Sequence, residues 1–167
     1  MPALTDMSSV MLDRALAQLA VVLDKAKAHC AERKIDEAVL LGMRLYPDMF
    51  ALTRQVQTAC DFSKFCVARI AGIDAPKFDD DEKSFDDLLA RIARTRAFIA
   101  SVPAAQIDGQ EHKPVTIKMR ERELHTEALP YVQRMVLPNV FFHCATAYGI
   151  LRHAGVPLGK ADFIGAL

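Results

Sequence analysis

The stretch Leu12–Ala26, LDRALAQLAVVLDKA, decides the fold class, because its apolar residues recur at the spacing of an α-helix. Steps of four, three, four and three residues separate Leu12, Leu16, Leu19, Leu23 and Ala26. Because a helix turns once in about 3.6 residues, these side chains form one stripe along one face. The pattern predicts a long amphipathic helix over Asp6–Glu32.

A second amphipathic helix is predicted over Pro47–Ala71, where apolar residues again recur on one side. Pro47 suits the first helical position because its missing N–H is not needed there, and Gly72 suits the C-cap. Between these two helices, the segment Asp36–Leu45 predicts a short helical turn.

The third helix is predicted over Phe85–Ser101. Ser84 and Asp87 stand at its start with the spacing of a capping box. The preceding linker, Ile73–Lys83, contains the acidic run Asp79–Glu82. Such a run can bind a cation, but we interpret it as negative charge at a helix N-terminus.

The fourth main helix is predicted to begin near Pro138 and to end at His153, before Gly155. Phe142 and Ile150 lie opposite its main apolar stripe, so this helix must be covered on two sides. The second cover is the extended segment before it, the C-terminal tail or another subunit.

Helical periodicity is absent from Ile107–Tyr131. Within it Val115, Ile117 and Met119 alternate with polar residues, which indicates a short strand or extended arm with one face against the bundle. The run Arg120–Glu123 alternates in sign and is typical of a solvated surface.

These elements predict an all-α protein, an up-down four-helix bundle with a long, partly extended connection before the last helix. The 167 residues suit one domain, 1–167.

Lys and Arg number 21, as do Asp and Glu, so no excess positive charge is present to bind nucleic acid or an anionic membrane. No secretory signal or membrane-spanning stretch is apparent, so we expect a cytoplasmic protein.

The segment Gly155–Asp162 lacks the glycine spacing and the hydroxyl residue of a phosphate-binding loop. We expect its glycines to turn the chain so that Phe163, Ile164 and Leu167 pack on the bundle.

The cysteines form no CxxC pair and lie in apolar helical patterns, which predicts reduced structural thiols. They are Cys30, Cys60, Cys66 and Cys144.

Polar residues of the second and fourth helices are the candidates for chemistry. Gln57 and Asp61 are four residues apart, near Arg54 and away from the apolar stripe, and His143 lies on a flank of the fourth helix. One hypothesis brings Asp61, Gln57 and His143 together in the bundle interior as a metal or acid–base site. The other makes Gln57 and Asp61 a structural polar stripe, and His143 a packed histidine.

Several short motifs occur together over nearly the entire chain: Pro47-Asp48-Met49-Phe50, Arg54-Gln55-Val56-Gln57, Ala59-Cys60-Asp61, Leu137-Pro138-Asn139, Phe142-His143, Ala147-Tyr148, Ile150–Val156, Gly159-Lys160 and Asp162-Phe163. In this combination the chain resembles the bacterial family DUF1993, a domain of unknown function grouped with DinB-like and YfiT-like candidate metalloenzymes. The resemblance implies a four-helix DinB-like bundle, often a homodimer, without an assigned activity.

In better-known members of that superfamily, one histidine of the second helix and two of the fourth hold a divalent metal, and some members use a low-molecular-weight thiol. The present second helix has no histidine, with Asp61 as the nearest polar candidate, and Ala147 follows His143 by four residues. No three-histidine site is therefore carried over, and Asp61 and His143 remain candidate ligands of a weakly bound divalent metal. Together with Gln57 and Tyr148, they are the candidate ligand-binding residues.

Three functional hypotheses stay open. In the first, the bundle binds a small molecule without an intact three-histidine site. In the second, it is a divalent-metal-assisted transferase or hydrolase, in one form thiol-dependent, that uses Asp61 and His143. In the third, the role is structural and the fourth helix forms the interface of a homodimer.

Overall fold

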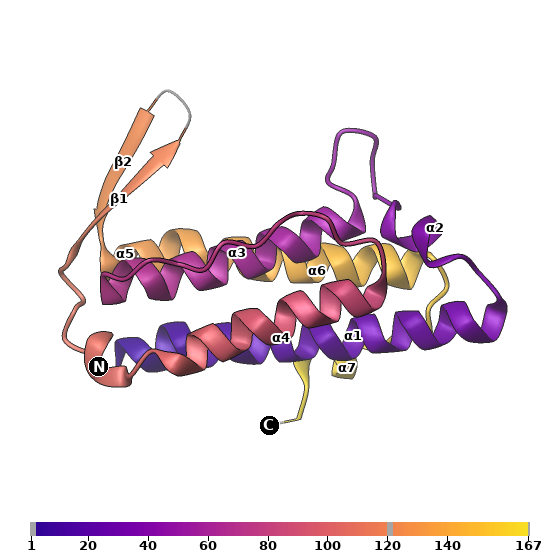
Figure 1. Cartoon of the computed structure of the whole chain (residues 1–167), viewed down its shortest axis with the longest axis horizontal. Coiled ribbons are helices and arrows are strands. Elements are labelled where there is room, and N and C mark those ends of the chain that lie inside the picture. The colour runs from indigo at the N-terminus through magenta and orange to yellow at the C-terminus, as the bar shows by residue number, and fades with distance from the viewer. Residues whose placement is uncertain (1–2, 120–121, 167) are drawn as a thin grey trace.

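In the computed structural model, which describes residues 3–119 and 122–166, four long helices run side by side (Figure 1). They are α1 (Met11–Arg33), α3 (Leu52–Ala71), α4 (Phe85–Ser101) and α6 (Leu137–His153). Both α1 and α3 pack against α4 and α6. The predicted all-α four-helix bundle is therefore confirmed.

The apolar stripe of α1 forms part of the core, as predicted. Its five members are at most 3% exposed: Leu12, Leu16, Leu19, Leu23 and Ala26. A single π-helical turn, η1 (Asp6–Val10), leads into α1. The spacing of apolar residues thus correctly identified both the helix and the face that it buries.

Both predicted helix boundaries around the linker are confirmed. Gly72 ends α3 with a φ of 75°, a left-handed conformation that glycine adopts readily. At the start of α4, Ser84 Oγ accepts a hydrogen bond from the Asp87 N–H at 3.1 Å, and Asp87 Oδ2 accepts one from the Ser84 N–H at 3.0 Å. Hydrogen bonds from the Lys83 backbone and from Ser84 lower the pKa of Asp87 below its ordinary value.

The prediction that the second helix begins at Pro47 is wrong. The short helix α2 (Glu37–Leu41) ends early, and α3 begins only at Leu52. The intervening loop is closed by a hydrogen bond of 2.9 Å from the Leu52 N–H to the carbonyl of Met43. Pro47 lies in a turn of this loop, where its fixed φ is as favourable as at a helix start.

The last helix, α6, begins and ends close to the predicted residues, but further helical turns precede it. α5 (Ala128–Tyr131) and the π-helical turn η3 (Val132–Val136) lead directly into α6. Pro138 lies where the hydrogen-bond pattern changes from π to α, so its missing N–H is tolerated there. Ile150, which was predicted to lie opposite the main stripe and to need a second cover, is 1% exposed and belongs to the core, whereas Phe142 is 55% exposed.

A β-hairpin lies at one end of the bundle, before α5 and after the short 3-10 helix η2 (Ala104–Gln106) (Figure 1). β1 (Pro114–Met119) pairs antiparallel with β2 (Arg122–Glu127). Val115 and Ile117 are buried, and the residues that alternate with them are exposed. The predicted extended arm with one covered face is therefore confirmed.

Two predictions fall partly on residues outside the described ranges. In the run Arg120–Glu123, residues 120 and 121 are outside them, and the other two are exposed, as predicted. In the tail, α7 (Lys160–Ile164) packs against α1, which confirms the docking of Phe163 and Ile164. Leu167 is outside the described residues.

No helix in the described ranges has the length and hydropathy needed to cross a membrane.

The linker between α3 and α4 is held by Arg91, whose side chain is fully buried. Its Nη1 lies 2.8 Å from Glu82 Oε1, and its Nη2 lies 3.0 Å from both Asp61 and Asp80. Nη1 also donates to the backbone carbonyl of Asp79 at 3.1 Å. Burial disfavours the charged guanidinium, but Glu82 and Asp61 outweigh it and raise the pKa of Arg91 above its ordinary value.

The acidic run of the linker therefore has a different role from the one predicted. Asp80 and Glu82 pair with Arg91, and Asp80 also pairs with Arg54. Together with Asp61 they form what we call the Arg91 cluster. Because the partners come from α3, the linker and α4, the cluster ties these three segments together.

We expect Arg91→Met to lower the free energy of unfolding by about 3–5 kcal/mol, because it leaves the carboxylate of Glu82 buried without a counter-charge. Urea denaturation monitored by circular dichroism measures this change. The matched control is Arg152→Met, since Arg152 is exposed on α6. Equal effects of the two substitutions would mean that the cluster does not hold the linker.

Candidate functional site

The structure places Asp61 in the Arg91 cluster and Gln57 beside it. Asp61 Oδ1 lies 3.0 Å from Arg91 Nη2 and 2.9 Å from Lys64 Nζ. Gln57 Nε2 donates to Glu82 Oε2 at 2.8 Å. These contacts agree with the hypothesis of a structural polar stripe. Asp61 is thus bound to α4 and Gln57 to the linker, and neither side chain contacts His143.

His143 projects from α6 toward a different residue of α3, Gln55. Its Nδ1 lies 2.6 Å from Gln55 Oε1, and Gln55 Nε2 donates to the carbonyl of Phe50 at 3.0 Å. Because that carbonyl can only accept, it turns the amide oxygen of Gln55 toward the imidazole. In neutral His143 the proton is therefore on Nδ1, and Nε2 carries the lone pair.

Three phenylalanines surround this imidazole. The rings of Phe50 and Phe62 are nearly parallel to it, each with its centroid 6.3 Å away, and Phe142 presents an edge at 5.3 Å. Burial, with a smaller effect from the charge of Arg54, lowers the pKa of His143 below its ordinary value of 6.5. His143 is therefore neutral at pH 7, the form that accepts a proton or binds a metal.

The residues around His143 do not fit a three-histidine metal site. The residue that faces it from α3 is Gln55, a neutral amide already engaged with the ring N–H. Ala147, one turn later on α6, is fully buried and offers only a methyl group. Within residues 3–119 and 122–166, no three His, Cys, Asp or Glu side chains are grouped so that they could hold an ion. The chemistry that remains here is that of a single neutral imidazole.

The cysteines are reduced and buried, as predicted. Burial raises the pKa of three of these thiols to about 12: Cys60, Cys66 and Cys144. It also raises the pKa of Cys30. Since the thiolate is the reactive form, these side chains act as packing groups at neutral pH.

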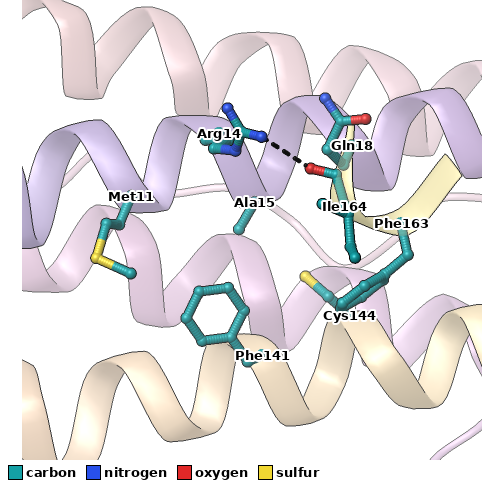
Figure 2. A pocket seen from close by; sticks show the side chains of 8 residues that line it. All are labelled: Met11, Arg14, Ala15, Gln18, Phe141, Cys144, Phe163 and Ile164. Atoms are coloured by element: carbon teal, nitrogen blue, oxygen red, sulfur yellow. Dashed lines mark hydrogen bonds between the residues drawn. The ribbon is translucent and has the colours of Figure 1, made fainter. Parts of the chain in front are cut away.

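A pocket of about 350 Å³ lies between α1, α6 and α7 (Figure 2). Each of these three helices contributes two apolar residues: Met11, Ala15, Phe141, Cys144, Phe163 and Ile164. The two polar lining residues, Arg14 and Gln18, lie on consecutive turns of α1. The pocket is therefore apolar except along its α1 edge.

The C-terminal tail forms one wall of this pocket and is tied to α1. Arg14 Nη2 donates to the carbonyls of Ile164 and Ala166 at 3.0 and 2.8 Å. Gly165 has a φ of 75°, and a Cβ there would lie only 2.5 Å from the side chain of Gln18. Glycine is thus needed both for the turn and for the close approach to α1.

Tyr148, one of the predicted ligand-binding residues, contacts the wall of this pocket. Its ring meets that of Phe163, a wall residue, edge to face at a centroid distance of 5.9 Å. Such a pair holds the α7 wall against α6. Tyr148 thus supports the wall, while Gln57, Asp61 and His143 are absent from the lining.

Sequence reasoning missed Gln55 and the pocket residues of α1 and α6. Gln55 is 1% exposed on an otherwise apolar face that includes Leu52 and Ala59. A polar residue in an apolar stripe needs a buried partner, and this signal was available in the sequence. Phe141 and Met11 carry no such signal, since an apolar residue in a helix is ordinarily explained by packing.

The depressed pKa of His143 predicts that the free energy of unfolding falls as the pH is lowered from about 7 to about 5. Above pH 6.5 the ring is neutral in both states, whereas below it the unfolded chain takes up the proton first. His143→Gln should reduce this pH dependence, as measured by urea denaturation at both pH values. His153→Gln, at an exposed position of the same helix, is the control and should keep the wild-type dependence. If His143→Gln keeps it in full, the neutral ring is not part of the folded state.

Comparison with known proteins agrees with this architecture. The family model DUF1993, described as a domain of unknown function, matches residues 4–164. The crystal structure of a DinB family member protein from Shewanella denitrificans is 37% identical in sequence, with 98% of this chain and 93% of that chain covered and a TM-score of 0.88. No curated protein matches the sequence significantly. The chain therefore belongs to the DUF1993 family and has a DinB-like fold.

Proposed function

We propose that this protein binds a small apolar molecule in the pocket between α1, α6 and α7. The observation that supports this most directly is the lining, in which six apolar side chains from three helices surround about 350 Å³. Ligand pockets of proteins span about 300–1,000 Å³ and are lined mainly by apolar groups. Removing the apolar surface of a ligand from water would supply the driving force.

The alternative function, a metal-assisted transferase or hydrolase, has less support. Its two candidate ligands have different partners, since Asp61 pairs with Arg91 and Lys64, and His143 pairs with Gln55. Binding without a metal is therefore the function that we propose.

Ala15→Phe tests this proposal, because the larger ring would fill the pocket from α1. We expect the neutral fluorophore N-phenylnaphthylamine to bind the wild type with enhanced emission, and Ala15→Phe to weaken binding by about tenfold or more. Ile164→Asp, which places a carboxylate in the exposed wall, should weaken it similarly.

The matched control is Ala100→Phe, at an exposed position of α4. Thermal melting of each variant separates loss of binding from loss of folding. If the fluorophore does not bind the wild type, or binds Ala15→Phe and Ile164→Asp as tightly, this pocket is not the binding site.

We also propose that the protein forms a homodimer through the outer face of α6. The sequence between Arg134 and Arg152 contains no Asp, Glu, Lys or Arg, although Phe142 is 55% exposed and Ala145 is exposed as well. A second copy of α6 would cover this uncharged face, and the small residues Ala145 and Gly149 would let two helices approach closely.

Sedimentation velocity at micromolar concentration should give the mass of a dimer for the wild type. Ala145→Arg should shift the protein to a monomer, because it would bury a charge in the interface. Ala100→Arg is the control, since Ala100 is an equally simple exposed alanine on α4. A wild type that remains monomeric under these conditions would contradict the proposal.

A further inference from the structure

The polarity of the α1–α6–α7 pocket is one-sided. Arg14 and Gln18 lie along its α1 edge, and apolar side chains of α6 and α7 lie opposite them (Figure 2). Among the described residues that line the pocket, none is acidic. A bound molecule would therefore meet one positive charge at the edge and an apolar surface in the interior.

The hydrogen bonds of Arg14 orient its guanidinium without neutralising it. Both come from Nη2 and go to backbone carbonyls, those of Ile164 and Ala166. These are uncharged acceptors on the tail. Because Nη2 donates to these two carbonyls, Nη1 and Nε are the donors that remain, and each can give a charge-assisted hydrogen bond to a carboxylate oxygen.

Nearby charges of α1 are paired within the protein. Asp13, the residue before Arg14, accepts hydrogen bonds from Arg96 Nε at 2.7 Å and from Arg96 Nη2 at 3.0 Å. Lys25 pairs with Asp162 of α7 at 2.7 Å. Within the part of the chain that the structure describes, Arg14 is the cation that lines the pocket.

We propose that the ligand of this pocket is an amphipathic anion, a carboxylate with an unbranched or aromatic apolar tail. The carboxylate would lie at Arg14 on the α1 edge, and the tail would pack between Ala15, Phe141 and Phe163. This inference rests on the proposed function, since it specifies the chemical class of the molecule that the pocket binds. A cationic amphiphile would be repelled at the same edge, and a neutral one would lose the charge-assisted hydrogen bonds.

Isothermal titration calorimetry with decanoate and decanol, at pH 8 and below the micellar concentration, tests the inference. Decanoate should bind the wild type at least about tenfold more tightly than decanol. Arg14→Met keeps the apolar stem and removes the charge, so it should abolish this preference. Loss of the two hydrogen bonds to the tail should lower the affinities for decanoate and decanol alike and leave their ratio near one. Arg33→Met, at an exposed position of α1, is the control and should behave as the wild type.

A second variant distinguishes the effect of the positive charge of Arg14 from the effect of its hydrogen bonds to the tail. Asp162→Asn breaks the ion pair with Lys25 and loosens α7 without changing the charge of the pocket lining. It should weaken decanoate and decanol by the same factor and leave their ratio unchanged. The ratio of the two affinities therefore reports on the charge alone.

The possible outcomes distinguish the two proposals. If decanol and decanoate bind the wild type equally well, or if Arg14→Met keeps the preference for decanoate, the inference about the ligand class is wrong and the proposal of an apolar pocket stands. If neither compound binds, and N-phenylnaphthylamine also fails to bind, both are wrong. A preference for decanoate that Arg14→Met alone removes would support both.

Discussion

The buried guanidinium of Arg91 is the interaction on which the arrangement of this bundle depends. One side chain of α4 binds Asp61 of α3 and two carboxylates of the linker, Asp80 and Glu82. A buried charge is tolerated only when counter-charges and hydrogen bonds surround it, and removing one partner is costly. The linker is thereby fixed along α3 and α4, although most of it has no regular secondary structure.

Two faces of α3 contact different parts of the protein. The face with Gln57 and Asp61 serves the linker and α4, whereas Gln55 and Phe62 contact His143 of α6. Successive residues of a helix point about 100° apart, so polar residues close in sequence are separated in space. The imidazole is left with an amide and three aromatic rings, an environment that keeps it neutral but supplies no further metal ligand.

The pocket depends on the C-terminal tail. Without α7 the groove between α1 and α6 would be an open apolar surface. Arg14, through two backbone carbonyls, and Gly165, through its close contact with Gln18, hold the tail against α1. The same arginine that completes the wall also provides the positive charge at its edge. Binding and the position of the tail are therefore physically linked, and both depend on the α1 side of the pocket.

The sequence by itself determined what depends on neighbours along the chain: the stripe from Leu12 to Ala26, the capping box of Ser84 and Asp87, and the end of α3 at Gly72. These follow from helical periodicity and from local hydrogen bonds. Only the tertiary structure decided that Asp61 meets Arg91 instead of His143, that Gln55 orients the imidazole, and that Phe141 and Ile164 line one pocket. Such contacts depend on how each helix is rotated and placed against the others, which is set by the packing of the whole core and not by residue spacing within one helix.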